Sequence, residues 1–228
     1  MSVIVNRRRV MGGGGESYTA SSYVQDGLIG QYDGIENAGV GVHGSPQTWK
    51  DLIGSNDLLL ENITWGDDGA IYNGSDSVAY LSSLPFSDSF QSVEICATMT
   101  GSEGWMTFQF SNSYYMGYNG SGRLIVATKG RGFNDYLRTA FTPTSAHTAS
   151  ALTNKKLAVD GVIQRTNAYK TNGASQNNKY QTLFGARYFN SRISMVLTGR
   201  IHSIRIYDKN LSQEELTKNY NIDMKRFG

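Results

Sequence analysis

The sequence predicts an all-β protein, an antiparallel β-sandwich or jelly roll that ends in one short helix. The 228-residue chain has 26 glycines and 14 tyrosines, and only 18% of its residues are charged. Few stretches therefore have the Ala, Leu, Glu and Lys bias of long helices. Short alternating apolar runs recur about every 8–15 residues with turn residues between them, which is typical of sandwiches and jelly rolls. A single domain of this length can bury a full core.

The N-terminal region differs in composition from the rest of the chain. A basic run at residues 7–9 is followed by four glycines at residues 12–15, which a helix or strand does not readily hold. We expect residues 1–25 to form an N-terminal arm with a Gly-rich joint, and residues 26–228 to form one folded domain. The arm is either a disordered tail or an extended anchor that binds another subunit. The candidate anchoring residues are Val3, Val5, Arg7, Arg8 and Arg9.

Charge and cysteine content exclude several classes of protein. The net charge of +2 gives no overall electrostatic case for binding nucleic acid or an anionic membrane. Cys96 is the only cysteine, so we expect a small buried side chain and no disulfide framework. The start of the sequence lacks a signal-peptide pattern, and no apolar run reaches the roughly 18 residues of a membrane span. We therefore expect synthesis and assembly in a cytoplasm.

The strands can be placed by their alternation and by the turns between them. Three dipeptides, at positions 73–74, 119–120 and 160–161, are Asn-Gly or Asp-Gly and predict hairpin turns between the strands that flank them. The apolar run at 90–101 predicts a central strand. The predicted strand segments are 27–34, 48–60, 69–81, 90–101, 104–110, 114–128, 135–141, 155–166, 180–189 and 197–207.

The stretch "LSQEEL" at 211–216 predicts the start of the C-terminal helix. Ser212 is placed to be the N-cap, with Glu215 three residues later completing a capping box. Leu211 and Leu216 are spaced to form a hydrophobic staple, and Glu214 lies near the positive end of the helix dipole. We expect Leu216 and Tyr220 to share the face that covers the sandwich.

The order of these motifs resembles a concanavalin A-like (laminin-G-like) jelly-roll domain. The matching stretches are "GLIGQYDG", "TWKDLIGSND", "GAIYNGSDSVAYL", "LAVDGVIQ" and "FGARYF…LTGRIHSIRIYDKNLSQEEL…NY", which span residues 27–220. The last stretch is the most specific of them. Such domains occur in bacterial surface proteins and phage proteins, and the fold hosts both glycoside hydrolases and non-catalytic lectins, so the fold alone does not settle the function.

The acidic residues do not form the catalytic pattern that the resemblance would require of a hydrolase. Such an enzyme needs two carboxylates on one face of a strand. Glu94 lies on a predicted strand, but positions 96 and 98 are Cys and Thr. The histidines show no nucleophile-elbow context, and we expect His202 to be a structural hydrogen-bonding group. The sequence therefore predicts no catalytic residues and no enzymatic activity of the familiar type.

Glycan binding is the activity that the resemblance most often implies. It requires aromatic faces for the apolar sides of sugars, together with polar side chains, and two segments offer both. Alternatively, the same aromatic residues pair across strands and fill the core. The candidate glycan contacts are Tyr114, Tyr115, Tyr118, Asn119, Arg187, Tyr188 and Asn190.

Calcium is the only cofactor that we consider. Some domains of this type hold it at a loop rim with Asp side chains and backbone carbonyls. Asp67, Asp68 and Asp76 are the candidates, although the same residues in "GDDG" and "NGSDS" are also common turn formers. We predict no other metal or cofactor.

Together these features favour a non-catalytic structural or decoration protein on a phage head or tail. Its arm would bind other virion proteins, the jelly roll would be displayed for adhesion to cell-surface or mucosal glycans, and the protein would be a homo-oligomer. The alternatives are a freestanding glycan-binding protein or adhesin that acts outside the cell and, third, a divergent polysaccharide hydrolase or lyase.

The predicted capping box gives a direct test. We expect Ser212→Ala to lower the free energy of unfolding by about 1 kcal/mol, because a backbone N–H of the first helical turn loses its acceptor. Urea unfolding measures the change. An unchanged midpoint would contradict the assignment of Ser212 as the N-cap.

Overall fold

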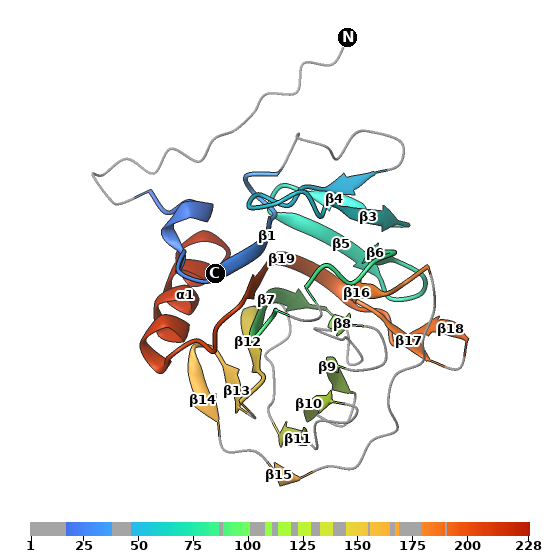
Figure 1. Cartoon of the computed structure of the whole chain (residues 1–228). Coiled ribbons are helices and arrows are strands. Elements are labelled where there is room, and N and C mark those ends of the chain that lie inside the picture. Colours follow the sequence, from blue (N-terminus) through green and yellow to red (C-terminus); the bar gives the residue numbers. More distant parts are fainter. Residues whose placement is uncertain are drawn as a thin grey trace.

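The structure is a computed structural model that shows a β-sandwich with one helix packed on its outside (Figure 1). The all-β prediction with a short C-terminal helix is confirmed. The described residues are 17–37, 47–86, 89–100, 108–110, 114–119, 123–128, 133–138, 145–154, 156–164, 167–168, 179–189 and 191–228. Within them, no helix has the length and apolar character that crossing a bilayer requires.

Within the described ranges, the strands form two large antiparallel sheets and one small hairpin. The first sheet, sheet A, has the order β14-β13-β12-β7-β19-β5-β4, with β1 also paired to β19. Its strands are β1 Leu28–Asp33, β4 Thr64–Gly66, β5 Gly69–Asn73, β7 Ser92–Met99, β12 Ala146–Leu152, β13 Lys156–Val159, β14 Val162–Gln164 and β19 Thr198–Tyr207.

The second sheet, sheet B, has the order β15-β11-β10-β9-β8-β16-β6-β3-β2. Its strands are β2 Thr48–Trp49, β3 Leu58–Glu61, β6 Val78–Leu81, β8 Phe108–Phe110, β9 Tyr114–Asn119, β10 Arg123–Thr128, β11 Phe133–Arg138, β15 Asn167–Ala168 and β16 Thr182–Phe184. The hairpin is β17 Arg187–Phe189 with β18 Arg192–Ser194, and the helices are the 3-10 turn η1 Ala20–Ser22 and α1 Gln213–Arg226.

Strand β19 organises sheet A. One of its edges pairs with β7 along its length, and the other edge is shared, first by β5 and then by β1. The register with β7 shifts between Ile201 and Ser203, which marks a β-bulge at His202. At the junction between β5 and β1, Gly34 donates its N–H to the carbonyl of His202. The bulge therefore lies where β19 changes partner.

The core lies between the two sheets. Apolar residues from alternate positions of β7 and β19, including Ile95, Ile204 and Ile206, meet Trp49 and Phe184 of sheet B, and all of them are fully buried. This alternation leaves the intervening residues of sheet A on its outer face, toward α1. That face carries polar and charged residues, so the helix must satisfy them as well as cover them.

The start of α1 follows the prediction. Glu215 donates its N–H to Ser212 Oγ at 3.2 Å, and Ser212 donates its N–H to Glu215 Oε2 at 2.9 Å. Leu211 and Leu216 are both buried in one apolar cluster beneath the helix. The capping box and the staple are therefore confirmed. Tyr220 is only partly buried.

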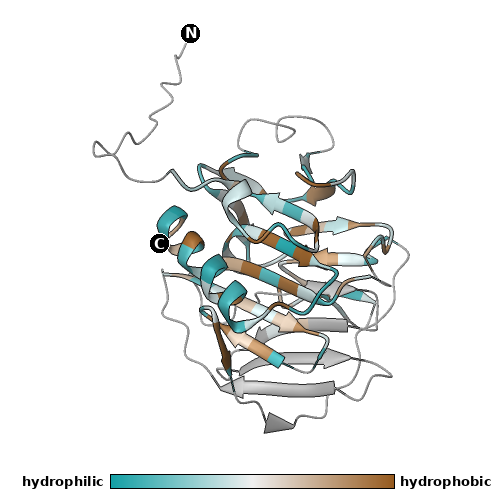
Figure 2. Cartoon of the chain, turned by 60° about the vertical axis from the view of Figure 1, so that its left-hand side comes forward, coloured by the Kyte–Doolittle hydropathy of each residue, from teal (hydrophilic) through white to brown (hydrophobic). Residues whose placement is uncertain are grey.

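Farther along α1, the side that faces sheet A is polar. Asn219 and Asp223 are fully buried there, while the helix ribbon as a whole is mostly hydrophilic in Figure 2. Both residues bind charged or polar groups of the strands below. The helix is therefore held by a buried polar network and by the apolar contacts at its first turn.

Arg205 of β19 is the centre of that network. Its Nε donates to Glu94 Oε2 at 3.1 Å, and Nη2 donates to Asp223 Oδ2 at 2.7 Å. All three side chains have 0% exposure. Nη1 reaches Ser203 Oγ and Asp223 Oδ1, both at 2.9 Å. One guanidinium thus joins two strands and the helix, and bidentate pairing to Asp223 fixes its plane.

Both carboxylates of the network are also hydrogen-bonded elsewhere. Glu94 accepts from Ser150 Oγ at 3.1 Å and from Asn219 Nδ2 at 2.6 Å. Asp223 accepts from Thr148 Oγ1 at 2.6 Å and from the Tyr23 hydroxyl at 2.8 Å. Burial raises the pKa of Glu94, and the positive charge of Arg205 opposes this shift. The network meets the condition under which buried charges are tolerated, because each one has several partners.

The segment before β1 closes the network on its open side. The Tyr23 ring lies over the Arg205 guanidinium, with Cζ 4.1 Å from the ring centroid, and it is 1% exposed. Val24 donates its N–H to Asn219 Oδ1 at 2.9 Å. Packing therefore places Ala20, Tyr23 and Val24 in the folded domain, earlier than the boundary predicted at residue 26. For residues 1–16, which lie outside the described residues, the arm stays a prediction.

The three predicted turns have different outcomes. Strands β9 and β10 pair across positions 119–123, and β13 and β14 pair around Asp160, with φ +50°, and Gly161, with φ +73°. Both hairpins are confirmed. The prediction for Asn73-Gly74 is wrong, because β5 belongs to sheet A and β6 to sheet B. Asn73 Oδ1 instead accepts the N–H groups of residues 75, 76 and 77 and caps a turn between the sheets.

We predict that Arg205→Met lowers the free energy of unfolding by about 3–5 kcal/mol, because two buried carboxylates lose their shared cation. Urea unfolding of the full chain measures this. Lys209→Met is the matched control, since the ion pairs of Lys209 with Asp26 and Glu215 are near the surface, where ion pairs contribute little to stability. Equal effects of the two substitutions would contradict a central role for Arg205.

Candidate functional site

A cavity of about 360 Å³ opens on the outer face of sheet A, beside the C-terminal end of α1. Strands β5, β7 and β19 form its floor, and the residue that follows the helix, Phe227, forms part of its wall. We call it the Arg200 pocket. Its lining residues are Asp68, Ile71, Tyr72, Thr98, Thr100, Gly199, Arg200, His202 and Phe227.

Arg200 and Asp68 form an ion pair in this pocket. Arg200 Nη1 donates to Asp68 Oδ1, and the side chains are 33% and 29% exposed. The guanidinium lies against β4, where a Cβ at Gly66 would come within 2.9 Å of Arg200 Cζ. Glycine at position 66 therefore leaves room for the arginine. The pair offers a cationic donor and an anionic acceptor side by side.

His202 lies behind this pair and is held on both ring nitrogens. Nδ1 lies 3.1 Å from the carbonyl oxygen of Asp68, and Nε2 lies 2.8 Å from Thr98 Oγ1. Because a carbonyl only accepts, Nδ1 carries a hydrogen, and the neutral tautomer satisfies both bonds by accepting from Thr98. Because of the bulge, His202 and Ser203 both lie on the outer face of sheet A. Bulges often redirect side chains next to functional sites.

The far side of the pocket combines an aromatic wall and a hydroxyl. The Phe227 ring stacks on His202, with centroids 4.9 Å apart and an angle of 21° between the planes. Thr100 is exposed and donates its hydroxyl to the carbonyl of Thr198 at 3.2 Å. The pocket therefore holds hydroxyl, carboxylate and guanidinium groups next to apolar surface.

The charge state of Asp68 follows from its neighbours. The hydrogen bond with His202 lowers the pKa of Asp68, burial opposes this shift, and Arg200 lowers the pKa further. Asp68 is thus ionised at neutral pH and accepts hydrogen bonds only. Small-molecule sites are commonly concave regions of about 300–1,000 Å³ with a few convergent polar groups, and the Arg200 pocket fits that description.

The predicted glycan contacts Arg187 and Tyr188 lie elsewhere, on β17 near sheet B. Both are buried, with exposures of 7% and 8%. Tyr188 packs in an apolar cluster, and its ring centroid lies 5.9 Å from that of Tyr180. Their present packing offers little surface to a sugar. Their role in glycan binding stays a prediction.

A more exposed group lies next to them and was not anticipated. Glu61 accepts hydrogen bonds from the hydroxyls of Tyr80, at 2.8 Å, and Tyr180, at 3.1 Å, and pairs with Lys179 at 2.7 Å. Burial and the bond to Glu61 raise the pKa of Tyr80 to about 12. Partial burial would raise the pKa of Glu61, but the bonds from Lys179 and the tyrosines outweigh it and lower the pKa. This cluster is a polar surface around aromatic rings.

The other predicted contacts fall at the edge of what the structure describes. Tyr114, Tyr115, Tyr118 and Asn119 lie on β9, and their side chains are outside the described part of the chain. In the register of sheet B, Tyr115 pairs with Gln109. Asn190, like the anchoring candidates Val3, Val5, Arg7, Arg8 and Arg9, lies outside the described residues.

Two of the three acidic residues that were proposed as calcium ligands are bound to other side chains. Asp76 accepts from Asn62 Nδ2 at 3.0 Å and from Asn73 Nδ2 at 2.7 Å, and Asp68 pairs with Arg200. Asp67 is exposed. Within the described ranges, no group of three or more His, Cys, Asp or Glu side chains is arranged to hold a metal ion.

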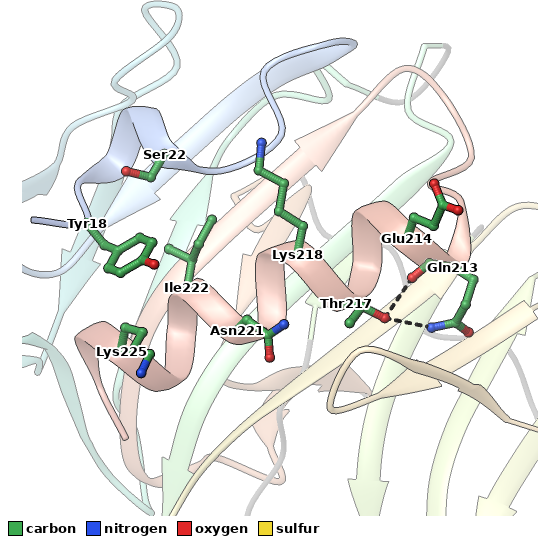
Figure 3. Close-up of a pocket in the computed structure, with 9 residues that line it drawn as sticks. All are labelled: Tyr18, Ser22, Gln213, Glu214, Thr217, Lys218, Asn221, Ile222 and Lys225. Atoms are coloured by element: carbon green, nitrogen blue, oxygen red, sulfur yellow. Dashed lines mark hydrogen bonds between the residues drawn. The ribbon is translucent and has the colours of Figure 1, made fainter. Parts of the chain in front are cut away.

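A second depression runs along the outer side of α1, next to the segment that leads to η1 (Figure 3). It is lined by Tyr18, Ser22 and seven residues of the helix, including Lys218 and Ile222. Figure 3 shows side chains that point outward from the helix, and the drawn hydrogen bonds lie among Gln213 and Thr217. This groove, of about 570 Å³, is larger than the Arg200 pocket, but it lies along the outside of one helix and not on the floor of a sheet.

The sequence contained a usable signal for the pocket. Arg200 and His202 are two positions apart on one strand, so alternation places them on the same face. The prediction that His202 is a structural hydrogen-bonding group agrees with the two hydrogen bonds of its ring. Thr98, Thr100 and Phe227 reach the pocket from distant positions and gave no signal of their own.

The two packed antiparallel sheets define a β-sandwich, an architecture that hosts both enzymes and binding proteins. The family model for the concanavalin A-like lectin/glucanases superfamily matches residues 73–217, more than half of the chain. The chain belongs to this superfamily. No protein of curated function matches the sequence significantly.

Solved structures show the same fold at low sequence identity. Trypanosoma rangeli sialidase in complex with sialic acid gives a TM-score of 0.63 at 12% identity, over 89% of this chain and 34% of that one. The same sialidase with the inhibitor DANA gives 0.61 at 12% identity, over 86% and 33%. The chain thus spans about a third of the length of these sialidases. At such identity, the likeness concerns the fold alone.

Proposed function

We propose that the chain is a non-catalytic glycan-binding module that is displayed on a virus particle. The observation that carries the binding part is the Arg200 pocket on a fold of the lectin/glucanase superfamily. Its floor is a rigid sheet, and its polar groups are positioned by bonds that exist without a ligand. Such pre-organisation lowers the cost of ordering side chains on binding.

The packing of the acidic residues supports a non-catalytic role. Glu94, the carboxylate on a central strand, is 0% exposed and bound to Arg205, Ser150 and Asn219. Its cross-strand neighbours, Ser150 and Arg205, carry no second carboxylate. A retaining glycosidase needs two carboxyl groups about 5–5.5 Å apart that both reach the substrate. Glu94 is placed to stabilise the fold.

The virion part of the proposal rests on sequence. The basic run and the four glycines of the first 16 residues fit an attachment segment, and domains resembling this one occur in phage proteins. The described domain begins with residues that pack firmly on α1, so a partner bound to the first 16 residues would be tied to a stable body. We further propose binding to other virion proteins and homo-oligomer formation, as in many particle-surface proteins.

There are two alternatives to this function. A freestanding adhesin would use the same pocket without a particle. A hydrolase is supported by the chain of contacts from Thr98 Oγ1 through His202 to Asp68, whose Oδ2 lies 3.4 Å from His202 Nδ1. This is the order of nucleophile, base and acid in hydrolytic triads. Release of reducing sugar or acid from polysaccharide and ester panels would favour the hydrolase.

The binding proposal predicts that the full-length chain retains sugars on a glycan array, and that Arg200→Gln lowers the signal at least tenfold by removing the cationic donor. Tyr180→Phe, at a residue that packs beside sheet B, is the control and keeps the signal. Circular dichroism and thermal unfolding confirm that both variants are folded. Absence of binding by the unmodified chain to any glycan would contradict the proposed function.

The display proposal predicts that deletion of residues 1–16 abolishes incorporation into particles and leaves sugar binding intact. A deletion that extended to residue 25 would also remove Tyr23 from the buried network and would confuse anchoring with folding. Particle purification followed by immunoblotting measures incorporation. Normal incorporation of the shortened chain would contradict anchoring through this segment.

A further inference from the structure

We infer that the Arg200 pocket selects an uncharged sugar residue with neighbouring hydroxyl groups and rejects its acidic counterpart. This inference rests on the proposed function, and it names the class of ligand for that same site. It depends on three features of the pocket: its charge balance, its set of donors and acceptors, and its size.

The charges within the pocket compensate each other. The Arg200 guanidinium is paired with the Asp68 carboxylate, and the His202 ring is bonded to the Asp68 carbonyl and to Thr98 and lies 3.4 Å from Asp68 Oδ2. Among the described lining residues, Arg200 is the one that always carries a positive charge. A ligand carboxylate placed against Arg200 would also lie close to Asp68. Like-charge contact in a partly desolvated site opposes such binding.

The hydrogen-bonding groups suit hydroxyls. Asp68 can accept, and Arg200 can donate through N–H groups not used by Asp68. The hydroxyl oxygens of Thr98 and Thr100 keep acceptor capacity after donating to His202 and Thr198. A sugar hydroxyl both donates and accepts, so two adjacent hydroxyls can bridge Asp68 and Arg200. A carboxylate only accepts, and it would leave the acceptors unsatisfied.

The dimensions fit one sugar residue with part of its neighbour. The cavity of about 360 Å³ is bounded on one side by the sheet, with Ile71 and Phe227 as apolar lining. One face of a pyranose is apolar and can lie against such surface, while its hydroxyls face the ion pair. We therefore assign a terminal, uncharged pyranose as the ligand.

The test compares sugars that differ at one carbon. Methyl glucoside and methyl glucuronide, and methyl galactoside and methyl galacturonide, differ only by a hydroxymethyl group against a carboxylate. Titration calorimetry and saturation-transfer NMR with the full chain give their relative affinities. Asp68→Asn is the decisive variant, because it removes the carboxylate that compensates the Arg200 charge. The variant also changes the 3.4 Å contact of Oδ2 with His202 Nδ1, while the bond from His202 to the carbonyl of residue 68 remains. Tyr180→Phe is the control.

We expect the unmodified chain and Tyr180→Phe to bind at least one neutral glycoside tenfold or more tighter than its uronide partner. In Asp68→Asn this ratio falls tenfold or more. If the uronide binds as well as or better than the neutral sugar, the inference is overturned and the proposed function stands. A neutral preference that Asp68→Asn leaves unchanged also overturns it. If no glycoside binds, and the glycan array is also blank, the proposed function fails with it.

Discussion

The buried contact between Arg205 and its two carboxylates is the constraint on which the rest of the structure depends. Arg205 of β19 binds Glu94 of β7 and Asp223 of α1, and all three are fully buried. Two strands and the helix are thereby fixed to one planar group. Removing charges from water is costly, and the arrangement is stable only because each carboxylate accepts further hydrogen bonds. The network thus sets the position of the helix more specifically than apolar packing would.

The position of the helix in turn determines the pocket. With Asp223 held over Arg205, the last turn of α1 reaches β1, where Arg226 binds Asp33 through both terminal nitrogens. The next residue, Phe227, then lies on His202 at the edge of the sheet. The wall of the pocket is thus supplied by the end of a helix that a buried ion network holds in place. A site on rigid elements needs little rearrangement to bind its ligand.

Much of the fold could be predicted from the sequence because it rests on local patterns. The apolar run at 90–101 identified β7 as a central strand, and the spacing of Ser212, Glu215 and Leu216 identified the helix start. The turn at Asn73 was misassigned because an Asn-Gly pair favours a tight turn without stating which sheet the next strand joins. The packing of Tyr23 depends on a contact with Asp223, 200 residues away, which no local pattern reveals.

The site was less accessible to prediction than the fold. Aromatic residues drew attention to β9 and β17, but aromatic residues also fill the core, as Tyr188 does. The pocket instead combines Thr98, Arg200 and Phe227 from three separate segments. Only the alternation of Arg200 and His202 on one strand was visible beforehand. The bulge that places His202 next to the pocket follows from β-sheet register, which the sequence does not state.

The central claim is that this sandwich binds sugar on the sheet that carries the helix. Backbone amide chemical shifts of the labelled full chain, followed during titration with a bound glycoside, test it most directly. The account predicts that the largest changes occur at residues 98–100, 199–202 and 227, with little change on sheet B. Changes centred on β9 or on the cluster around Glu61, with none at the Arg200 pocket, would contradict it.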